Sequence, residues 1–183
     1  MKKPSPFKIC VSGAAETGHC GPDALDQAKA LGIEIAQHNA ILVTPAITGF
    51  PMWSAMGAQE AGGTVIGFSP AVNEQEHRDI YRLPTDHVDM PIYTGFGYAG
   101  RDLLMVRSSD AVIFGCGKID TIHEFTVAYE ENKVIGVLQG DWKTDTMLKK
   151  IADEAHRRDR IIIFDDDPRR LVEQLVRKLR EVA

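Results

Sequence analysis

The chain has 183 residues, of which 44% are hydrophobic and 26% charged, with 16 glycines and 9 prolines. A chain of this length can bury one well-filled core, and its composition excludes a collagen, a coiled coil and a disordered chain. The formal net charge of -5 provides no global field that would attract nucleic acid or anionic lipid, so neither is expected as a partner.

The cysteines give a first expectation about redox state and location. Cys10, Cys20 and Cys116 are an odd number and lack CxxC spacing, which predicts neither a disulfide framework nor a zinc knuckle. We therefore expect reduced thiols, with Cys10 in the core and Cys116 in a loop. No apolar run approaches the roughly 20 residues that span a bilayer, and residues 1–7 do not have the pattern of a leader peptide. The sequence predicts a cytoplasmic protein.

Short apolar runs alternate with helical patterns along the chain. The predicted strands are residues 7–12, 40–44, 64–68, 90–93, 111–114, 134–138 and 161–164. The predicted helices are residues 22–37, 51–61, 100–109, 121–132, 144–157 and a last helix that follows Asp167 as N-cap and buries Leu171, Leu175, Leu179 and Val182. Residues 69–90 show no period and are predicted to be a surface excursion.

Strands that are apolar on both faces and separated by helices are typical of a parallel sheet covered by helices. The sequence therefore predicts one Rossmann-like α/β domain over residues 1–183, with a mostly parallel sheet and helices on both faces. Ligands in such folds bind beyond the carboxyl ends of the strands, so chemistry is expected in the loops that follow them. These loops come after Val11, Val43, Tyr93, Phe114 and Leu138.

The first such loop, residues 13–20, has the glycine spacing of a P-loop. A P-loop needs Lys and then Ser or Thr after its second glycine, and this chain has His19 and Cys20 there. It is not GxGxxG either, and no acid follows the second strand to hold a ribose, so a dinucleotide dehydrogenase is not expected. What stays open is a loop that approaches a small phosphate or sugar with Ser12 and Gly13.

A second group of glycines runs from residue 95 to residue 117. Arg101 stands at the glycine-rich start of a predicted helix, and Arg is well suited to bidentate phosphate binding. Gly117 and Lys118 follow the buried strand 111–114 and precede the next helix. Backbone N–H groups, a lysine and a helix N-terminus at one sheet edge favour an anion.

Residues 101–113, continuing to Thr121 and Glu124, resemble the Lonely Guy (LOG) family, often labelled lysine decarboxylase-like. That family has an arginine before an Arg-x-Ser-Asp-Ala strand entry and then the motif PGGxGTxxE. Gly49 and residues 59–70 are similar to its second glycine loop and the helix and strand behind it. The resemblance covers most of the chain between residues 7 and 142.

The resemblance implies a phosphoribohydrolase that cleaves the base–ribose bond of a nucleoside 5'-monophosphate. Arg101 and Glu124 match the catalytic arginine and glutamate. A carboxylate can stabilise an oxocarbenium-like state and position water, which suits N-glycoside cleavage. The resemblance implies ligand contacts at Gly49, Gly117 and Thr121, and the positions of the loops add Ser12, Gly13 and Lys118 as expected contacts. The family also implies a homodimer, and we expect no cofactor and no metal.

The chain departs from the family motif in both glycine loops. Cys116 replaces the proline, Lys118 and Asp120 replace two glycines, and Thr44 to Ala46 replace a glycine run. Side chains at positions built for bare backbone can block a phosphate. Two alternatives to hydrolysis therefore stay open: a non-catalytic nucleotide-binding or sensing protein, and a carrier of a phosphorylated cofactor such as a pterin. Lysine decarboxylation is not supported.

Each candidate residue also has a purely structural interpretation. Thr121 and Glu124 have the spacing of a capping box, Arg101 can be a surface residue paired with an aspartate, and Lys118 can be a solvated loop lysine. His19 with Cys20, or His123 with Glu124, would make a poor zinc site because adjacent residues do not set up a tetrahedron. One predicted helix carries Met52, Trp53 and Met56. We expect these side chains in the core or at a dimer contact, or else in the apolar wall of a base pocket.

Overall fold

The computed structural model describes residues 5–155, 157 and 159–182. Its strands are β1 (Lys8–Ser12), β2 (Ile41–Thr44), β3 (Val65–Ser69), β4 (Met90–Tyr93), β5 (Ala111–Phe114), β6 (Val134–Leu138) and β7 (Ile162–Asp165). Its helices are α1 (Ala24–Gln37), α2 (Phe50–Glu60), α3 (Glu74–Asp79), α4 (Gly97–Ser108), α5 (Ile119–Glu130), α6 (Thr144–Glu154) and α7 (Pro168–Val182).

All the strand pairs are parallel, and the order across the seven-stranded sheet is β4-β3-β2-β1-β5-β6-β7. The chain moves outward from β1 to β4 and then returns to add β5 on the other side of β1. The direction of strand addition therefore reverses between β1 and β5. In open α/β sheets this reversal opens a crevice at the carboxyl ends of the two strands.

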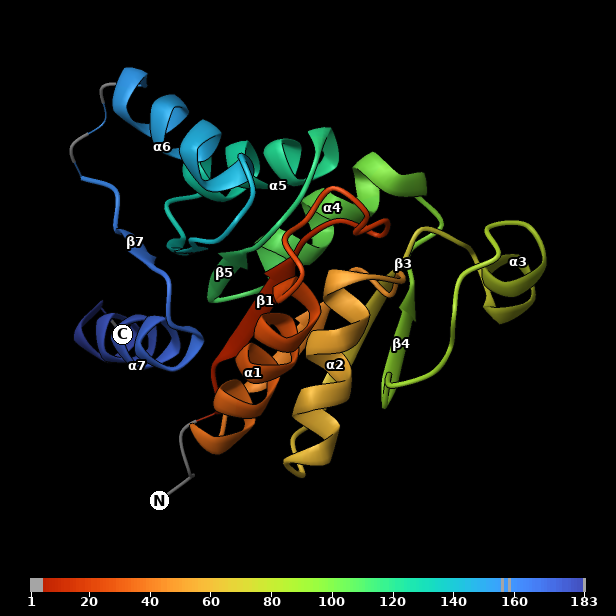
Figure 1. Cartoon of the computed structure of the whole chain (residues 1–183). Coiled ribbons are helices and arrows are strands. Elements are labelled where there is room, and N and C mark those ends of the chain that lie inside the picture. Colours follow the sequence, from red (N-terminus) through yellow and green to blue (C-terminus); the bar gives the residue numbers. More distant parts are fainter. Residues whose placement is uncertain (1–4, 156, 158, 183) are drawn as a thin grey trace.

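Helices cover both faces of the sheet, as Figure 1 shows: α1, α2 and α7 lie on one face and α4, α5 and α6 on the other. Each layer has its own apolar core. Leu31 of α1 and Leu175 of α7 belong to the first, and Met105 of α4 and Phe125 of α5 belong to the second. The predicted single α/β domain with a parallel sheet is confirmed.

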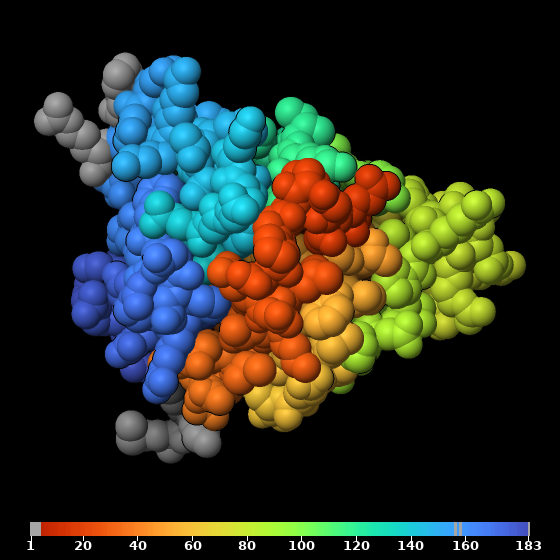
Figure 2. All heavy atoms as spheres, in the orientation of Figure 1, coloured from red at the N-terminus to blue at the C-terminus, as the bar shows by residue number. Residues whose placement is uncertain are grey.

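Strand β4 forms one edge of the sheet and contains Pro91. Proline cannot donate to a sheet ladder, so an edge is where a strand tolerates it. The excursion that precedes β4 projects from the body of the protein, at the right of Figure 2.

The sequence predicted a surface excursion over residues 69–90 without naming an element in it, and the structure adds the short helix α3 there. Asn73 caps this helix by accepting a hydrogen bond of 2.8 Å from the backbone of Glu76. The Glu76 carboxylate accepts one of 2.7 Å from the N–H of Val72. Residues 73–76 thus have the spacing of a capping box, a local signal that overrides the lack of periodicity.

The last two predicted helices need smaller corrections. The helix predicted over 144–157 ends at Glu154, and residue 156 lies outside the described residues. Asp167 caps α7 as expected, accepting from the N–H groups of Arg169 and Arg170. Val182 does not join the buried stripe, since its side chain at the end of α7 is 59% exposed. Within the part of the chain that the structure describes, none of the helices is long and apolar enough to cross a bilayer.

Helices α1 and α2 pack closely because glycines replace side chains where they meet. A Cβ at Gly32 would collide with the carbonyl oxygen of Ser54, and a Cβ at Gly57 would collide with that of Lys29. Both obstacles are backbone atoms, which cannot rotate away. The contact sets the position of α2, whose first residues lie at the ligand edge of the sheet.

We predict that Gly32→Ala destabilises the protein by about 1–3 kcal/mol, the usual cost of overpacking. Alanine normally stabilises a helix interior by about 1 kcal/mol relative to glycine, so a loss would identify the α1–α2 clash as its cause. Gly18→Ala is the control, because a Cβ there meets nothing within 4 Å. Urea unfolding measures both variants, and a Gly32→Ala variant as stable as the parent would contradict the packing account.

Candidate functional site

Three loops meet at the carboxyl edge of the central strands. The backbone N–H of Ala14, after β1, donates a 2.7 Å hydrogen bond to the carbonyl of Cys116, after β5. The carbonyl of Ala14 accepts a 2.9 Å hydrogen bond from the N–H of Phe50, at the start of α2. The loops predicted to carry chemistry after β1, β2 and β5 therefore form one connected layer over the sheet.

The glycines of these loops make room for neighbouring atoms. A Cβ on Gly13 would lie 2.8 Å from the ring of Phe50. Gly49 has φ 71°, and a Cβ on it would collide with the carbonyl oxygens of Ala14 and Ala15. Only glycine fits such a position comfortably. Ala46, where the LOG family usually has glycine, keeps a left-handed backbone with φ 54° and carries its methyl group at an energetic cost.

Arg101 is buried, with 3% exposure, and its guanidinium is already engaged. Its Nε donates to the carboxylate of Asp102 at 2.7 Å, and its Nη1 donates to the carbonyls of Pro45 and Phe68. These carbonyls lie at the ends of β2 and β3, so the side chain ties α4 to the sheet edge. The interpretation of Arg101 as a surface residue is wrong, although the arginine does pair with an aspartate, Asp102.

Asp102 also contacts the next helix. Its second carboxylate oxygen lies 3.2 Å from Nδ1 of His123, a residue whose side chain is 44% exposed. A buried arginine, a buried aspartate and a half-exposed histidine therefore form a chain from the sheet edge to the surface. His123 faces Asp102, which places it in this chain and not in a metal site with Glu124.

Glu124 is the other buried acid of this region, at 4% exposure. Burial raises the pKa of its carboxyl group from 4.5 to about 8, and the nearby charge of Asp102 adds to the increase. The Ser12 hydroxyl and the Arg101 guanidinium favour the ionised form but do not outweigh burial. Glu124 is therefore mostly protonated at neutral pH.

The capping-box interpretation of Thr121 and Glu124 is wrong. Helix α5 begins at Ile119 with Lys118 as its N-cap, and no side chain caps it. Thr121 Oγ1 and Glu124 Oε2 are buried and have no hydrogen-bond partner among the residues that the structure describes. The Glu124 carboxyl is thus buried and does not accept from the N–H groups at the helix start.

Further buried polar atoms without partners come from the same sheet edge. They are Ser12 Oγ at the end of β1, Thr44 Oγ1 at the end of β2 and Trp142 Nε1 after β6. Buried polar groups without partners are rare because each costs free energy. Their concentration at the ends of neighbouring strands indicates a place where a ligand or ordered water supplies the missing hydrogen bonds.

A cavity of about 780 Å³ opens beside this edge, between the loops after β1, β5 and β6. His19, Gly117, Lys118, Trp142 and Lys143 are among its lining residues. Neither Arg101 nor Glu124 belongs to the lining among the described residues. In Figure 2 the loop after β1 lies on the surface next to the segment that follows β6.

Two residues predicted to bind phosphate, Gly117 and Lys118, line this cavity, but they differ in whether their polar groups are available to a ligand. The side chain of Lys118 is 51% exposed and its Nζ lies 3.4 Å from a carboxylate oxygen of Glu16. The Gly117 N–H donates to Thr144 Oγ1 at 2.9 Å, and the same hydroxyl donates back to the Gly117 carbonyl. Lys118 can therefore exchange an exposed partner for an anion, whereas the Gly117 backbone is already satisfied.

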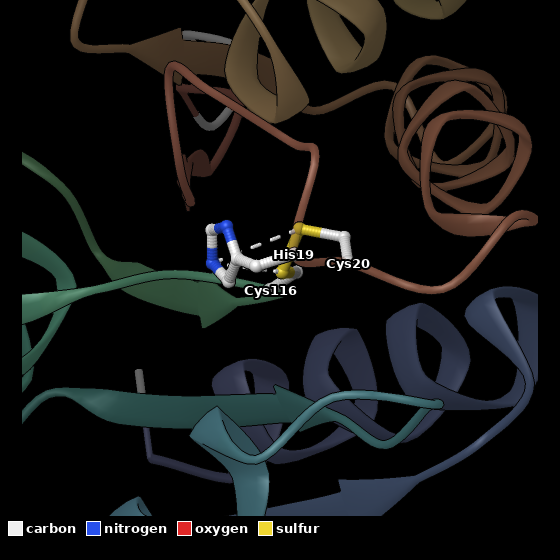
Figure 3. Close-up of side chains that lie close together, drawn as sticks. All are labelled: His19, Cys20 and Cys116. Carbon is white, nitrogen blue, oxygen red and sulfur yellow. Dashed lines mark hydrogen bonds between the residues drawn. A yellow bond between two sulfur atoms is a disulfide. The ribbon is translucent and has the colours of Figure 1, made fainter.

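The expectation of reduced thiols is wrong for two of the cysteines. Cys20 and Cys116 form a disulfide with a Cα–Cα distance of 5.9 Å, and Cys10 is free and buried as predicted. Figure 3 shows the imidazole of His19 beside both sulfur atoms. Spacing along the chain could not reveal this pair, because 96 residues separate the two cysteines and only the β1–β5 neighbour relation brings them together.

We predict that Glu124→Gln removes a pH dependence of stability. The folded pKa is raised above the unfolded value, so the stabilising effect is complete below pH 4.5 and is lost as the pH rises to about 8. Relative to the variant, the parent should lose up to about 5 kcal/mol across this interval. Urea unfolding at several pH values measures the difference. A constant gap between the two proteins would show that Glu124 ionises normally.

Comparison with known proteins places the chain in a family. Residues 6–172 match the SLOG cluster4 family. An uncharacterized protein from Archaeoglobus fulgidus is 30% identical over 133 residues, which cover 73% of this chain and 82% of that protein. The family match spans all the loops described above.

Solved structures share the fold over nearly the whole chain. The protein TM1055 superposes with a TM-score of 0.80 at 21% identity, covering 94% of this chain and 99% of that one. The molybdenum cofactor binding protein from the phototrophic bacterium Rippkaea orientalis superposes with a TM-score of 0.77 at 25% identity, covering 98% and 99%. These matches confirm the resemblance to LOG-type Rossmann-like proteins, and the chain belongs to the SLOG cluster4 family.

Proposed function

We propose that this protein binds a phosphorylated small molecule in the cavity between the loops after β1, β5 and β6, and holds it without hydrolysing it. The observation that carries the proposal is the cavity wall. It combines the exposed ammonium groups of Lys118 and Lys143 with the indole of Trp142, whose buried Nε1 has no hydrogen-bond partner. Cations suit a phosphate, and the indole supplies an apolar surface and an N–H donor for a planar ring.

The favoured ligand class is a phosphorylated pterin of the molybdenum-cofactor type, with nucleoside monophosphates as the other class. The similarity to the Rippkaea orientalis protein, which binds molybdenum cofactor, supports the first class. The resemblance to the LOG family supports the second. A volume of about 780 Å³ lies in the usual range of small-molecule sites and admits either ligand.

The proposal extends to the other residues predicted for the site. We assign Lys118 to the phosphate, and Ser12 and Thr121 to hydrogen bonds with ligand or water beneath the loops. Gly13, Gly49 and Gly117 then act through close backbone packing. We assign the whole chain, residues 1–183, to one LOG-like domain, and we propose a cytoplasmic location.

Binding without hydrolysis is supported by the state of the catalytic pair. A carboxylate that stabilises an oxocarbenium-like state or activates water must be ionised, and burial keeps Glu124 mostly protonated at neutral pH. Arg101 must be free to hold a phosphate or orient that carboxylate, and it is occupied by Asp102 and two backbone carbonyls.

Phosphoribohydrolase activity is the second candidate, and one observation favours it. Glu124 Oε2 lies buried without a partner at the edge where a ligand would bind, and a purely structural glutamate does not need that arrangement. A ligand that displaced Asp102 from Arg101 would bring the guanidinium and the Glu124 carboxyl into use together.

We predict that Lys118→Ala weakens binding of the preferred ligand by about 10- to 100-fold, the usual effect of losing a charge-assisted hydrogen bond. Lys150→Ala is the matched control, because Lys150 is exposed on α6 and does not line the cavity. Calorimetry with AMP, other nucleoside monophosphates and a phosphorylated pterin measures the affinities. Equal affinities for the Lys118 variant and the parent would contradict the assigned phosphate site.

The same ligands, incubated with the protein, test turnover. The proposal predicts binding with no release of free base or ribose 5-phosphate. Release that disappears in Glu124→Gln would establish the hydrolase in place of the carrier.

We also propose a homodimer that uses the apolar surface around α4. Phe96 and Tyr98 at the start of this helix are 70% and 51% exposed, and Leu103 and Leu104 are 42% and 38% exposed. Several large apolar side chains exposed on one short segment suit an interface between two copies of the chain.

We predict that Leu103→Lys converts the dimer to a monomer at micromolar concentration, because it buries an unpaired charge in the interface. Sedimentation velocity measures the change. Met147→Lys is the control, a comparably exposed apolar residue on α6. A parent protein that sediments as a monomer would rule out the dimer.

A further inference from the structure

His19, Cys20 and Cys116 form a cluster that the proposed function does not use. Their ligand atoms, one ring nitrogen and two sulfurs, all lie within 4.8 Å of one another. Two of the residues come from the loop after β1 and the third from the loop after β5, as Figure 3 shows. Cys116, from a distant loop, adds the third ligand atom that the adjacent residues His19 and Cys20 cannot supply by themselves.

The position of His19 is informative because its side chain is exposed and yet lies against sulfur. Its Nε2 is 3.5 Å from Cys116 Sγ and 4.0 Å from Cys20 Sγ, and these are the side-chain contacts that the structure gives for it. A neutral disulfide offers a histidine only a weak acceptor. The arrangement makes better sense for a pair of thiolates.

The distances match those of a tetrahedral metal centre. Bond lengths of about 2.3 Å to sulfur and 2.05 Å to nitrogen keep sulfur and nitrogen roughly 3.6 Å apart, and two sulfurs roughly 3.8 Å apart. The observed nitrogen–sulfur distances of 3.5 and 4.0 Å already lie near this value. Only the two sulfurs need to separate, and they do so when their bond is reduced.

We propose that His19, Cys20 and Cys116 form a three-ligand site for a thiophilic divalent cation of the Zn²⁺ class, with the disulfide as its alternative, oxidised state. Because His19 also lines the 780 Å³ cavity, the fourth coordination position is open to that cavity. Three protein ligands and one open position are typical of a zinc site that binds an exchangeable ligand.

Conversion of the Cys20–Cys116 disulfide to the metal-binding state needs two electrons and two protons. A dithiol reductant supplies two electrons and two protons, the sulfur–sulfur bond breaks, two thiols form, and the reductant becomes a disulfide. Binding of the cation then releases the two thiol protons as both sulfurs coordinate as thiolates. In a reducing compartment, where protein disulfides are rare, the metal-binding state would predominate.

The test uses Co²⁺ as a spectroscopic substitute for Zn²⁺ on the full chain. The protein is reduced with dithiothreitol, desalted anaerobically, and its free thiols are counted before titration. We expect one Co²⁺ per reduced chain, with an intense thiolate-to-cobalt absorption that Zn²⁺ removes, and no such absorption for the oxidised chain. Bound Zn²⁺ should also protect Cys20 and Cys116 from alkylation.

Variants assign the ligands. Cys20→Ser and Cys116→Ser should each abolish the one-equivalent site, and His19→Gln should weaken it at least tenfold. Cys10→Ala is the control, because Cys10 is a buried cysteine outside the cluster. Cys20 lies in a surface loop, so its variant remains informative if Cys116→Ser fails to fold. Absence of the absorption in the fully reduced parent, or its persistence in Cys20→Ser, would overturn the proposal.

Discussion

The hydrogen bond from the Ala14 N–H to the Cys116 carbonyl joins the two loops on either side of the sheet's switch point. Strand order alone would leave these loops as separate walls of a crevice. The Phe50 N–H adds the start of α2 to the same layer through the Ala14 carbonyl. Glycines then allow the backbone segments to approach closely, as at Gly49. The cavity and the cysteine cluster both depend on this layer, since the loops after β1 and β5 supply residues to each of them.

Burial determines what the two family residues can do. Arg101 and Asp102 form an ion pair that is almost completely removed from water. Breaking such a pair leaves an uncompensated buried charge and costs about 3–5 kcal/mol. A ligand that binds to the Arg101 guanidinium would have to offset this cost with its own binding free energy. Lys118 has no such constraint, because its partner Glu16 is a surface residue. The electrostatics therefore favour an anion at the lysine side of the edge.

The fold could be predicted from the sequence because its signals are local. Apolar runs such as residues 111–114 and the capped start of α7 each specify their own element. The site was predictable only in outline, since Arg101, Glu124 and Lys118 lie at the expected edge but their partners come from distant strands. The Arg101 contact with Pro45, the cavity wall at Trp142 and the Cys20–Cys116 bond all depend on strand order, which no local pattern encodes. The sequence did hold one overlooked signal, the Asn73 to Glu76 capping box of α3.

We propose above that the phosphate of the ligand lies in the cavity beside Lys118 and does not contact Arg101 or Glu124. A crystal structure of the protein with AMP or a phosphorylated pterin tests this placement most directly. We expect a phosphate in contact with Lys118 Nζ while the Arg101–Asp102 ion pair stays intact. A phosphate bound to Arg101, with Asp102 displaced and the Glu124 carboxyl in contact with the ligand, would contradict this placement.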